Sequence, residues 1–332
     1  MITISKDAEF LDNTMLSTYK ECPRRFLMRH ILHWRRAGLA TPLAFGLSWH
    51  DAMDVVWSHA KSISKNDLPR FALAKFLETW EEQGMDPEPS LEILEALGSR
   101  HPGTAHEMLR SYVEKRWRVL QSMELVQCEQ PFAVPLPGIE NVWYIGRLDK
   151  VVKHEGSTLV LEHKTTSSYK KDGGFQTLYV ESWYNDSQVK GYQFGGALFF
   201  PDLSQVWVDA ALVHKTVHDA FRFIAVAHQQ PLLDEWLCDT REWVRRIRTD
   251  RAKWKDAGGR LIDGIFPKNE QSCIGKYGAC SFLDICRTTA DPGILQDSLN
   301  GEAPEGYTED PWSPFDVLEM NRLIEQEDGK AK

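Results

Sequence analysis

The chain has 332 residues, of which 42% are hydrophobic and 26% are charged, a composition typical of a folded, soluble protein. No apolar run approaches the roughly 18 residues that a membrane-spanning helix needs, and the start, MITISKDAEF, lacks the basic and then apolar pattern of a signal peptide. These features exclude an integral membrane protein and lead us to expect a cytoplasmic protein without a membrane partner.

The net charge of −9 is unevenly distributed along the chain. Residues 291–332 contain eleven acidic and three basic side chains, and the rest of the chain is close to neutral. Basic residues gather in two stretches: Lys20, Arg24, Arg25, Arg29, Arg35 and Arg36, and then Arg241, Arg245, Arg246, Arg248 and Arg251. Such clusters permit a polyanionic partner despite the acidic average. Each stretch taken alone also fits an ordinary solvated helix face.

The predicted elements run from helices to strands and back to a helix. Apolar spacing and Pro or Gly breaks predict helices over 13–36, 44–60, 71–83, 89–98 and 104–122. Strands are predicted next, over 127–134, 142–153 and 157–164, with a short turn, HEG, before the last. A helix over 184–199, strands over 205–214 and 220–228, and a long basic helix over 231–257 complete the ordered part. From residue 291 we expect a loosely ordered acidic tail with at most a short helix over 314–326.

The strand STLVLEHKTT, residues 157–166, ends its apolar run in charged residues. Side chains alternate along a strand, so Glu162 and Lys164 share one face and His163 lies on the other. If this strand pairs with the preceding one as a hairpin, Asp149 comes alongside Glu162. Two carboxylates that converge with a lysine can bind a divalent metal and stabilise developing charge.

Four of the six cysteines form a second pattern, one distant residue and three grouped ones: Cys22, Cys273, Cys280 and Cys286. The grouped cysteines are separated by six and five residues, which fits poorly with the close cysteine pairs of most zinc sites. Four thiolates can also hold a [4Fe–4S] cluster, and the choice between iron–sulfur and zinc stays open. Cys128 and Cys238 are expected to be buried free thiols.

The segments GRLDKVV, LVLEHKTT and QVKGY, together with the cysteines, resemble the PD-(D/E)XK nucleases. The resemblance is to the RecB-like group, which includes the AddB nuclease domain and the nucleases of CRISPR adaptation, and it spans about residues 14–287. It implies an α/β fold with a restriction-endonuclease-like mixed sheet flanked by helices. It further implies a nuclease domain over 1–290, with a helical insertion at about 61–122, and the acidic tail over 291–332.

The resemblance also implies roles for individual residues. Asp149 and Glu162 would hold Mg²⁺ or Mn²⁺, helped by the backbone carbonyl of His163, and His50 would be a further ligand. Lys164 would position the attacking water and stabilise charge on the phosphate.

Two further sets of residues match features of the RecB-like group. Gln188 and Tyr192 match its Gln-xxx-Tyr motif and would touch the DNA backbone, although an amphipathic helix facing the sheet explains the same spacing. The four cysteines, including the cluster at 273–286, would bind an iron–sulfur cluster that staples the N-terminal helix to the C-terminal region.

The sequence therefore predicts a metal-dependent DNA nuclease, more specifically an exonuclease on single-stranded DNA ends in recombination or repair. No GxxxxGK[ST] motif is present, so any unwinding requires a helicase or recombination partner. The motifs and size suit a phage-encoded protein. The preference for ends rests on the insertion at 61–122 arching over the metals, and on Trp34, Trp243 and Trp254 stacking on bases. A non-catalytic nucleic-acid-binding module of the same fold and an RNA-directed nuclease are the alternatives.

Overall fold

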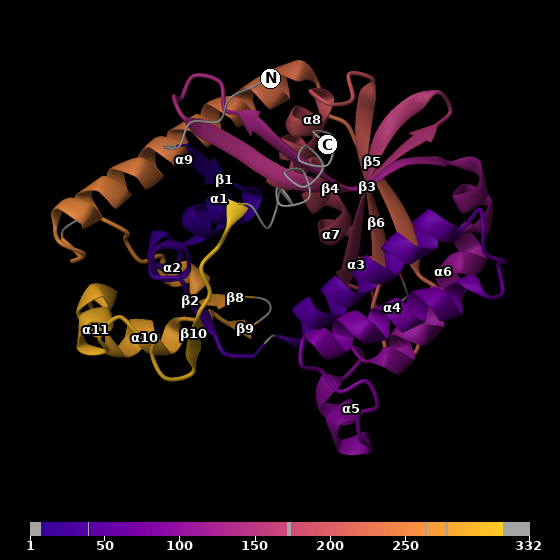
Figure 1. The fold of residues 1–332 in the computed structure, drawn as a ribbon, viewed down its shortest axis with the longest axis horizontal. Helices are drawn as coiled ribbons and strands as arrows, with labels where there is room; N and C mark the ends of the chain where they lie inside the picture. Colours follow the sequence, from indigo (N-terminus) through magenta and orange to yellow (C-terminus); the bar gives the residue numbers. More distant parts are fainter. Residues whose placement is uncertain (1–7, 39, 171–173, 263, 276–277, 315–332) are drawn as a thin grey trace, which may run out of the picture. The chain divides into compact units, whose positions relative to one another are not determined.

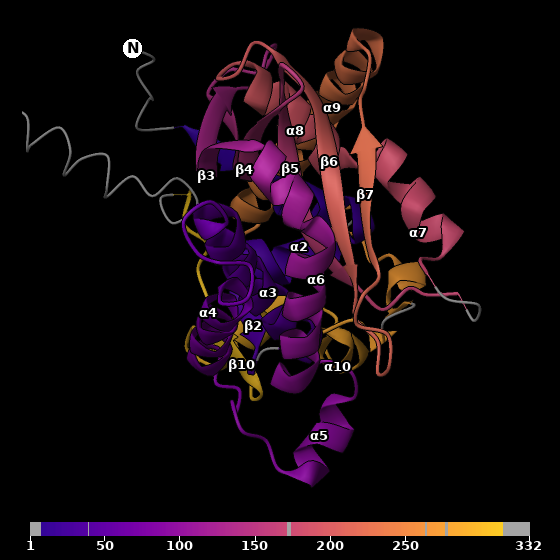
Figure 2. The ribbon, with the colours of Figure 1, turned by 90° about the vertical axis from the view of Figure 1, so that its right-hand side faces the viewer.

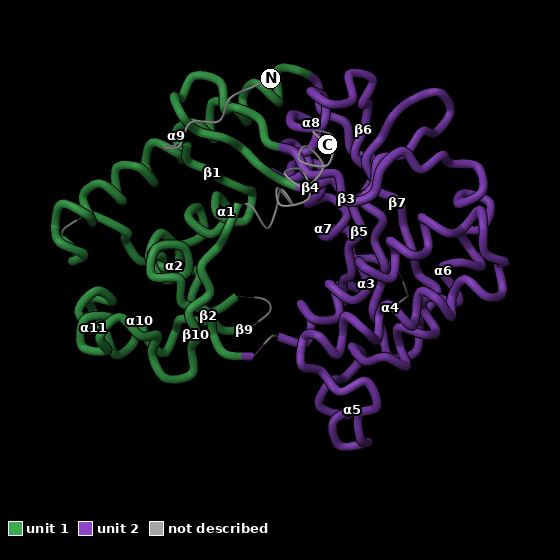
Figure 3. The backbone as a smooth tube through the Cα atoms, viewed as in Figure 1, with its two compact units in different colours: residues 1–37, 133–146, 230–332 green, residues 38–132, 147–229 purple. Residues whose placement is uncertain are grey.

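The structure, a computed structural model, describes residues 8–38, 40–170, 174–262, 264–275 and 278–314. The chain divides into two compact units, each assembled from separated stretches of sequence (Figure 3). Unit 1 comprises the described parts of 1–37, 133–146 and 230–332, and unit 2 those of 38–132 and 147–229. Two long strands, β3 (Glu124–Pro135) and β4 (Val142–His154), run from one unit into the other.

Unit 2 combines a helical layer with most of a sheet (Figure 1). Its helices are α3 (Thr41–His59), α4 (Leu68–Glu82), α5 (Leu91–Leu97), α6 (Pro102–Ser122), α7 (Thr177–Ser182) and α8 (Ser187–Ala197), with a 3₁₀ turn at Trp183–Asn185. Its further strands are β5 (Ser157–Thr166), β6 (Leu203–Leu212) and β7 (Phe221–Val226).

The sheet is mixed, with the order β1-β4-β5-β6-β7 and with β3 paired to β4; β1 is Glu9–Leu11. β4 pairs antiparallel with β5, and β6 with β7, whereas β5 and β6 are parallel. Parallel neighbours need a crossover connection, which the segment containing α7 and α8 provides. Strands β3 to β7 are drawn side by side in Figure 2. The predicted α/β fold with a mixed sheet flanked by helices is confirmed.

A two-residue turn sets the register between β4 and β5. Glu155 and Gly156 both have positive φ, 49° and 82°, as a type I′ hairpin turn requires. His154 pairs with Ser157, and the register then places Lys150 opposite Leu161. Continued by one residue, this register sets Asp149 opposite Glu162.

The core of unit 2 joins α3, α4 and α6 to one another and to the sheet. Phe45 of α3 packs edge-on against Phe76 of α4, with ring centroids 5.2 Å apart, and Leu161 and Ala211 supply buried surface from β5 and β6. Within the predicted insertion at 61–122, α4 and α6 bury apolar faces in this core, and the insertion itself stays a prediction. α5, by contrast, has no buried residue.

Unit 1 contains short elements around one long helix. They are β1, α1 (Asn13–Glu21), α2 (Pro23–Phe26), a π-helix (Leu27–Ile31), β2 (Trp34–Arg36), α9 (Gln230–Asp256), a 3₁₀ turn (Glu270–Ser272), β8 (Ile274–Gly275), β9 (Gly278–Ala279), α10 (Leu283–Thr288), α11 (Pro292–Ser298) and β10 (Tyr307–Glu309). None of the helices within the described ranges is long and apolar enough to cross a membrane.

The single helix predicted over 13–36 is wrong. Cys22 is extended, with φ −160°, because a residue before proline avoids the helical region, and Pro23 then starts a new short helix. Residues 34–36 form a strand instead, which pairs antiparallel with β10.

The loosely ordered tail is likewise wrong for the part up to residue 314. This part contains α11 and β10, and the Asp310 carboxylate binds the Arg29 guanidinium at 2.8 Å. From residue 315 on, the short helix predicted over 314–326 lies outside the described residues.

Candidate active site

Strands β4 and β5 bring three of the predicted residues together. Asp149 is 7% exposed and Glu162 only 2% exposed, so both carboxylates are buried. The Lys164 ammonium lies 2.5 Å from Glu162 Oε1, which confirms that the two side chains share a face. Asp149 Oδ2 accepts a hydrogen bond from the backbone N–H of His163 at 2.9 Å, and this bond ties the two strands at the site.

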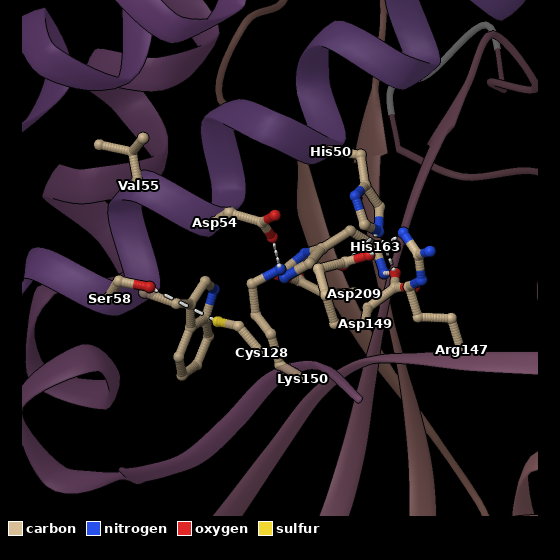
Figure 4. A network of polar contacts seen from close by, with 12 residues as sticks. His50, Asp54, Val55, Ser58, Cys128, Arg147, Asp149, Lys150, His163 and Asp209 are labelled. Atoms are coloured by element: carbon tan, nitrogen blue, oxygen red, sulfur yellow. Dashed lines mark hydrogen bonds and ion pairs between the residues drawn. The ribbon is translucent and has the colours of Figure 1, made fainter. Parts of the chain in front are cut away.

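Helix α3 delivers His50 to the same place. Its Nε2 lies 2.8 Å from Asp149 Oδ2. One helical turn further on, Asp54 forms an ion pair with the fully buried Lys150, whose Nζ lies 2.5 Å from Asp54 Oδ1. This ion pair joins α3 to β4 next to Asp149. Figure 4 shows His50 and Asp149 directed toward each other, and Lys150 directed toward Asp54. His50 thus lies beside Asp149, and its role as a metal ligand stays a prediction.

Sequence reasoning missed Glu129, on β3. Its Oε1 lies 3.6 Å from His50 Nε2, and its Oε2 lies 3.5 Å from the Arg147 guanidinium. Glu129 also has a φ of 50°, the left-handed region that a glutamate adopts only at a cost. No motif contains this residue. Only the pairing of β3 with β4 brings it to the site, and a charged residue inside a predicted strand was the one available signal.

The site residues fit a hard divalent cation. His50, Glu129 and Asp149 each offer a ligand atom, and these atoms lie within 4.8 Å of one another. Glu129 Oε1 and Glu162 Oε2 are buried without any hydrogen bond in the described part of the chain. Buried carboxylate oxygens without donors are costly unless a cation satisfies them. Oxygen-rich sites of this kind suit Mg²⁺ and Mn²⁺.

Electrostatics show how strongly negative charge is concentrated here. Burial raises the pKa of Glu162 to about 8, with a further contribution from the Asp149 charge and opposition from the Lys164 ammonium. Burial also raises the pKa of Glu129 to about 7. For His50, burial lowers the pKa, but the charge and hydrogen bond of Asp149 outweigh it and raise the pKa to about 9. The same pair holds the pKa of Asp149 below its usual range against its own burial.

Helix α8 adds Gln188 and Tyr192 on one face. The Asp186 side chain caps the helix by accepting from the backbone N–H groups of Gln188 and Val189. Gln188 Nε2 donates to Tyr192 Oη at 2.8 Å and to Glu162 Oε1 at 3.1 Å. Both predicted residues therefore lie at the site, and Gln188 directly orients a carboxylate. Their contact with a nucleic-acid backbone stays a prediction.

Behind β5, a buried polar network surrounds His163. Its Nδ1 lies 3.3 Å from Asp209 Oδ2 on β6. From α6, Tyr112 donates to the same carboxylate at 2.5 Å, and Arg116 Nη2 donates at 3.2 Å. Burial, followed by the Asp209 charge, raises the pKa of Tyr112 well above its usual value. The His163 ring thus faces away from Glu162, as predicted; the metal-binding role of its carbonyl stays a prediction.

The four cysteines of the predicted cluster all belong to unit 1. Cys22 is buried and the other three are half-buried. Across the described residues, no three ligand atoms that include a cysteine sulfur lie within 4.8 Å of one another. The cysteines still act on each other electrostatically: burial raises the pKa of Cys280, and Cys22 and Cys273 raise it further.

Cys128 and Cys238 only partly match their expected burial. Cys128 is half-buried at the end of the α3 network, with its sulfur 3.5 Å from Ser58 Oγ (Figure 4). Cys238 is exposed, so its predicted burial is wrong.

The predicted stacking tryptophans are mostly core. Trp34 and Trp254 are buried, so neither presents a face for a base, and this part of the prediction is wrong. Trp243 is half-buried, and its ring faces are near the Lys20 ammonium and the Arg246 guanidinium, 5.9 and 4.9 Å from the ring centroid.

Three comparisons show what the chain is similar to. The family model of the PD-(D/E)XK nuclease superfamily matches residues 13–287. No curated protein matches the chain. Among solved structures, a similar one is titled "Putative exonuclease" and comes from Eubacterium rectale. It is 14% identical, with a TM-score of 0.48, over 90% of this chain and 98% of that one.

Proposed function

The chain belongs to the PD-(D/E)XK nuclease superfamily, and from this premise we propose that it is a metal-dependent deoxyribonuclease of the RecB-like type. The observation that carries the proposal is the meeting of Asp149, Glu162 and Lys164 with His50 at one buried site. A binding module without catalysis would have no use for two buried carboxylates and an ammonium held in this arrangement.

The site residues would have different roles in phosphodiester hydrolysis. His50, Glu129, Asp149 and Glu162 would hold Mg²⁺ or Mn²⁺. The metal supplies Lewis acidity toward the phosphate and lowers the pKa of a water molecule. Lys164, kept in place by Glu162, sets a positive charge where negative charge grows on the phosphate. Gln188 holds the Glu162 carboxylate in its orientation.

We further propose that the substrate is single-stranded DNA with a free end. The support is the burial of Asp149 and Glu162, since a flexible strand reaches recessed groups more readily than a rigid duplex. Recombination or repair, with strands supplied by a separate helicase, is the process that this substrate suggests.

The test compares linear and circular single-stranded DNA of equal length in Mn²⁺, with matched RNA as a third substrate. We expect rapid loss of the linear DNA while the circle and the RNA persist. Glu162→Gln should abolish cleavage, because it removes a metal-binding charge and keeps the shape. Equal cleavage of circle and linear DNA would show an endonuclease, preferential cleavage of RNA would show a ribonuclease, and full activity of Glu162→Gln would overturn the site.

We also propose that Cys22, Cys273, Cys280 and Cys286 bind a [4Fe–4S] cluster. The support is the spacing of the grouped cysteines, six and five residues apart, which fits poorly with the close cysteine pairs of most zinc sites and is compatible with an iron–sulfur cluster. Protein-only contacts already join the two segments: Arg24 Nε donates to the Phe266 carbonyl at 3.0 Å, and Asn269 Nδ2 donates to the Glu21 carbonyl at 2.8 Å.

Anaerobic purification tests the cluster. The protein should be brown and contain about four irons per chain, and Cys22→Ser should remove the colour and lower the melting temperature. Cys238→Ser is the matched control, because this exposed cysteine is outside the set. Stoichiometric zinc in place of iron would contradict the proposal.

A further inference from the structure

Unit 1 contains a cavity of about 250 Å³ that is separate from the residues of the active site. Its walls come from β1, α1, the π-helix, α9 and the segment at 312–314. The volume corresponds to roughly eight water molecules of the bulk liquid, so the cavity can admit a small ligand. Phe10 and Trp312 give it apolar walls, and the side chains that matter most are His30, His33 and Arg251.

His30 is the least satisfied polar residue of this cavity. It is 8% exposed, and both of its ring nitrogens are buried without a hydrogen-bond partner among residues 8–314 as far as they are described. Buried ring nitrogens in proteins nearly always have partners. His30 lies in the π-helix, an irregularity that is often found at functional sites. His33 repeats the feature with an unpartnered, buried Nδ1 and a left-handed backbone, φ 58°.

Arg251 contributes a half-buried guanidinium to the cavity wall. It lies over the Phe26 ring, 5.4 Å from the centroid, and makes no hydrogen bond or ion pair with any described residue. The carboxylate in the cavity wall, Glu9, forms its ion pair with Arg248, whose Nε lies 3.1 Å from Glu9 Oε2, and acts on the Arg251 charge without pairing with it. Arg251, which forms no ion pair with a described residue, therefore lies beside three unpartnered ring nitrogens, both of His30 and Nδ1 of His33.

The charges around the cavity define which ligand would complete the set. Burial lowers the pKa of His30 to about 3, and every charge that contributes further is cationic: Arg29, Arg251, His33 and Arg25. On His33, Glu309 and Asp310 oppose the same arginines, and Asp310 is ion-paired with Arg29. The arginines around His30 therefore favour an anion in the cavity.

We propose that this cavity binds a phosphate monoester. The guanidinium supplies a planar pair of donors suited to phosphate oxygens, and each neutral imidazole can donate one N–H. A monoester suits the site better than a diester, because only a terminal phosphate can enter a pocket while its ester group stays against Phe10 and Trp312. The ligand is either a free mononucleotide or the phosphorylated end of a strand. The inference goes beyond the proposed nuclease function and does not depend on it.

Calorimetry on the full-length protein, in EDTA and at constant ionic strength, tests this site without any cleavage. Inorganic phosphate and deoxyadenosine monophosphate should both bind, and deoxyadenosine should not. A short single-stranded oligonucleotide with and without a 5′-phosphate then separates the two sources. Binding that requires the 5′-phosphate identifies strand ends, and binding of the mononucleotide alone identifies free nucleotides.

Variants show whether the binding belongs to this cavity. Arg251→Gln should weaken phosphate binding about tenfold or more, because it removes a charged donor, and His33→Asn should weaken it less. Arg245→Gln is the matched control, since it removes one exposed charge from the same helix outside the cavity. Equal affinity of the Arg251→Gln and Arg245→Gln proteins, or binding of deoxyadenosine as tight as that of its monophosphate, would overturn the proposal.

Discussion

Glu129 combines two unfavourable features at the active site. A glutamate with a left-handed backbone conformation carries a conformational cost, and its Oε1 is buried without a hydrogen bond. Strain of this kind persists where the surroundings enforce it, and here the surroundings are His50 and Arg147. A role as a metal ligand would account for both the backbone strain and the Oε1 atom without a hydrogen bond.

Replacing Glu129 by Gln should therefore weaken Mn²⁺ binding by about tenfold, the lower end of the usual cost of disturbing a metal site. Gln keeps the shape and removes the charge, so the circular dichroism spectrum should not change. Titration of Mn²⁺ followed by electron paramagnetic resonance measures the affinity directly. Glu124→Gln, on an exposed position of the same strand, should bind Mn²⁺ like the unaltered protein. Unchanged affinity in Glu129→Gln would limit Glu129 to a structural role.

At the scale of elements, strand β5 is held from both of its faces. Gln188 of α8 contacts Glu162 on one face, and Asp209 of β6 approaches His163 on the other. The Asp209 carboxylate joins β6 to α6 through Tyr112 and Arg116. This network keeps β5 in register with β6, and a slip of one residue would move Glu162 and Lys164 to the wrong face.

Asp209→Asn should lower the free energy of unfolding by about 3 kcal/mol, because it leaves the Arg116 guanidinium without its buried counter-charge. Urea denaturation measures the loss. The adjacent residue on α6 provides a matched control: Lys115 pairs with Asp219 at the surface, where an ion pair contributes about 1 kcal/mol or less. Asp219→Asn should therefore change stability little. Similar losses in the two variants would show that the buried network stabilises the fold no more than the surface ion pair does.

At the scale of the whole molecule, two units of different construction share the chain. Unit 2 has a large aromatic core, whereas unit 1 relies on short elements, one long helix and buried polar groups such as His30 and Arg24. Such groups make stability depend on pH, because a buried imidazole resists protonation.

His30 provides a test of that dependence. Its pKa is about 3 in the folded protein against an ordinary value of 6.5, so the unfolded chain binds more protons below pH 6.5. Stability should therefore fall as the pH falls from about 6.5 toward 3, by at most about 1.4 kcal/mol per pH unit from this residue. Urea unfolding at several pH values should show a shallower slope for His30→Gln than for His59→Gln, an exposed control. Equal slopes would assign the acid sensitivity to other groups.

The sequence by itself determined the features that depend on local periodicity. Glu162, His163 and Lys164 alternate because a strand repeats every two residues, and a two-residue turn at Glu155 and Gly156 is enough to bring Asp149 beside them. The four-residue spacing of Gln188 and Tyr192 likewise places both on one helix face.

Only the tertiary structure decided the features that depend on pairings between distant segments. Glu129 joins the site because β3 pairs with β4, and residues 34–36 become a strand because β10 provides the partner. The burial of Trp34 and the cavity at His30 are set by packing among segments more than 200 residues apart. Local spacing carries no information on such contacts, because their free energy comes from surfaces that meet only in the folded chain.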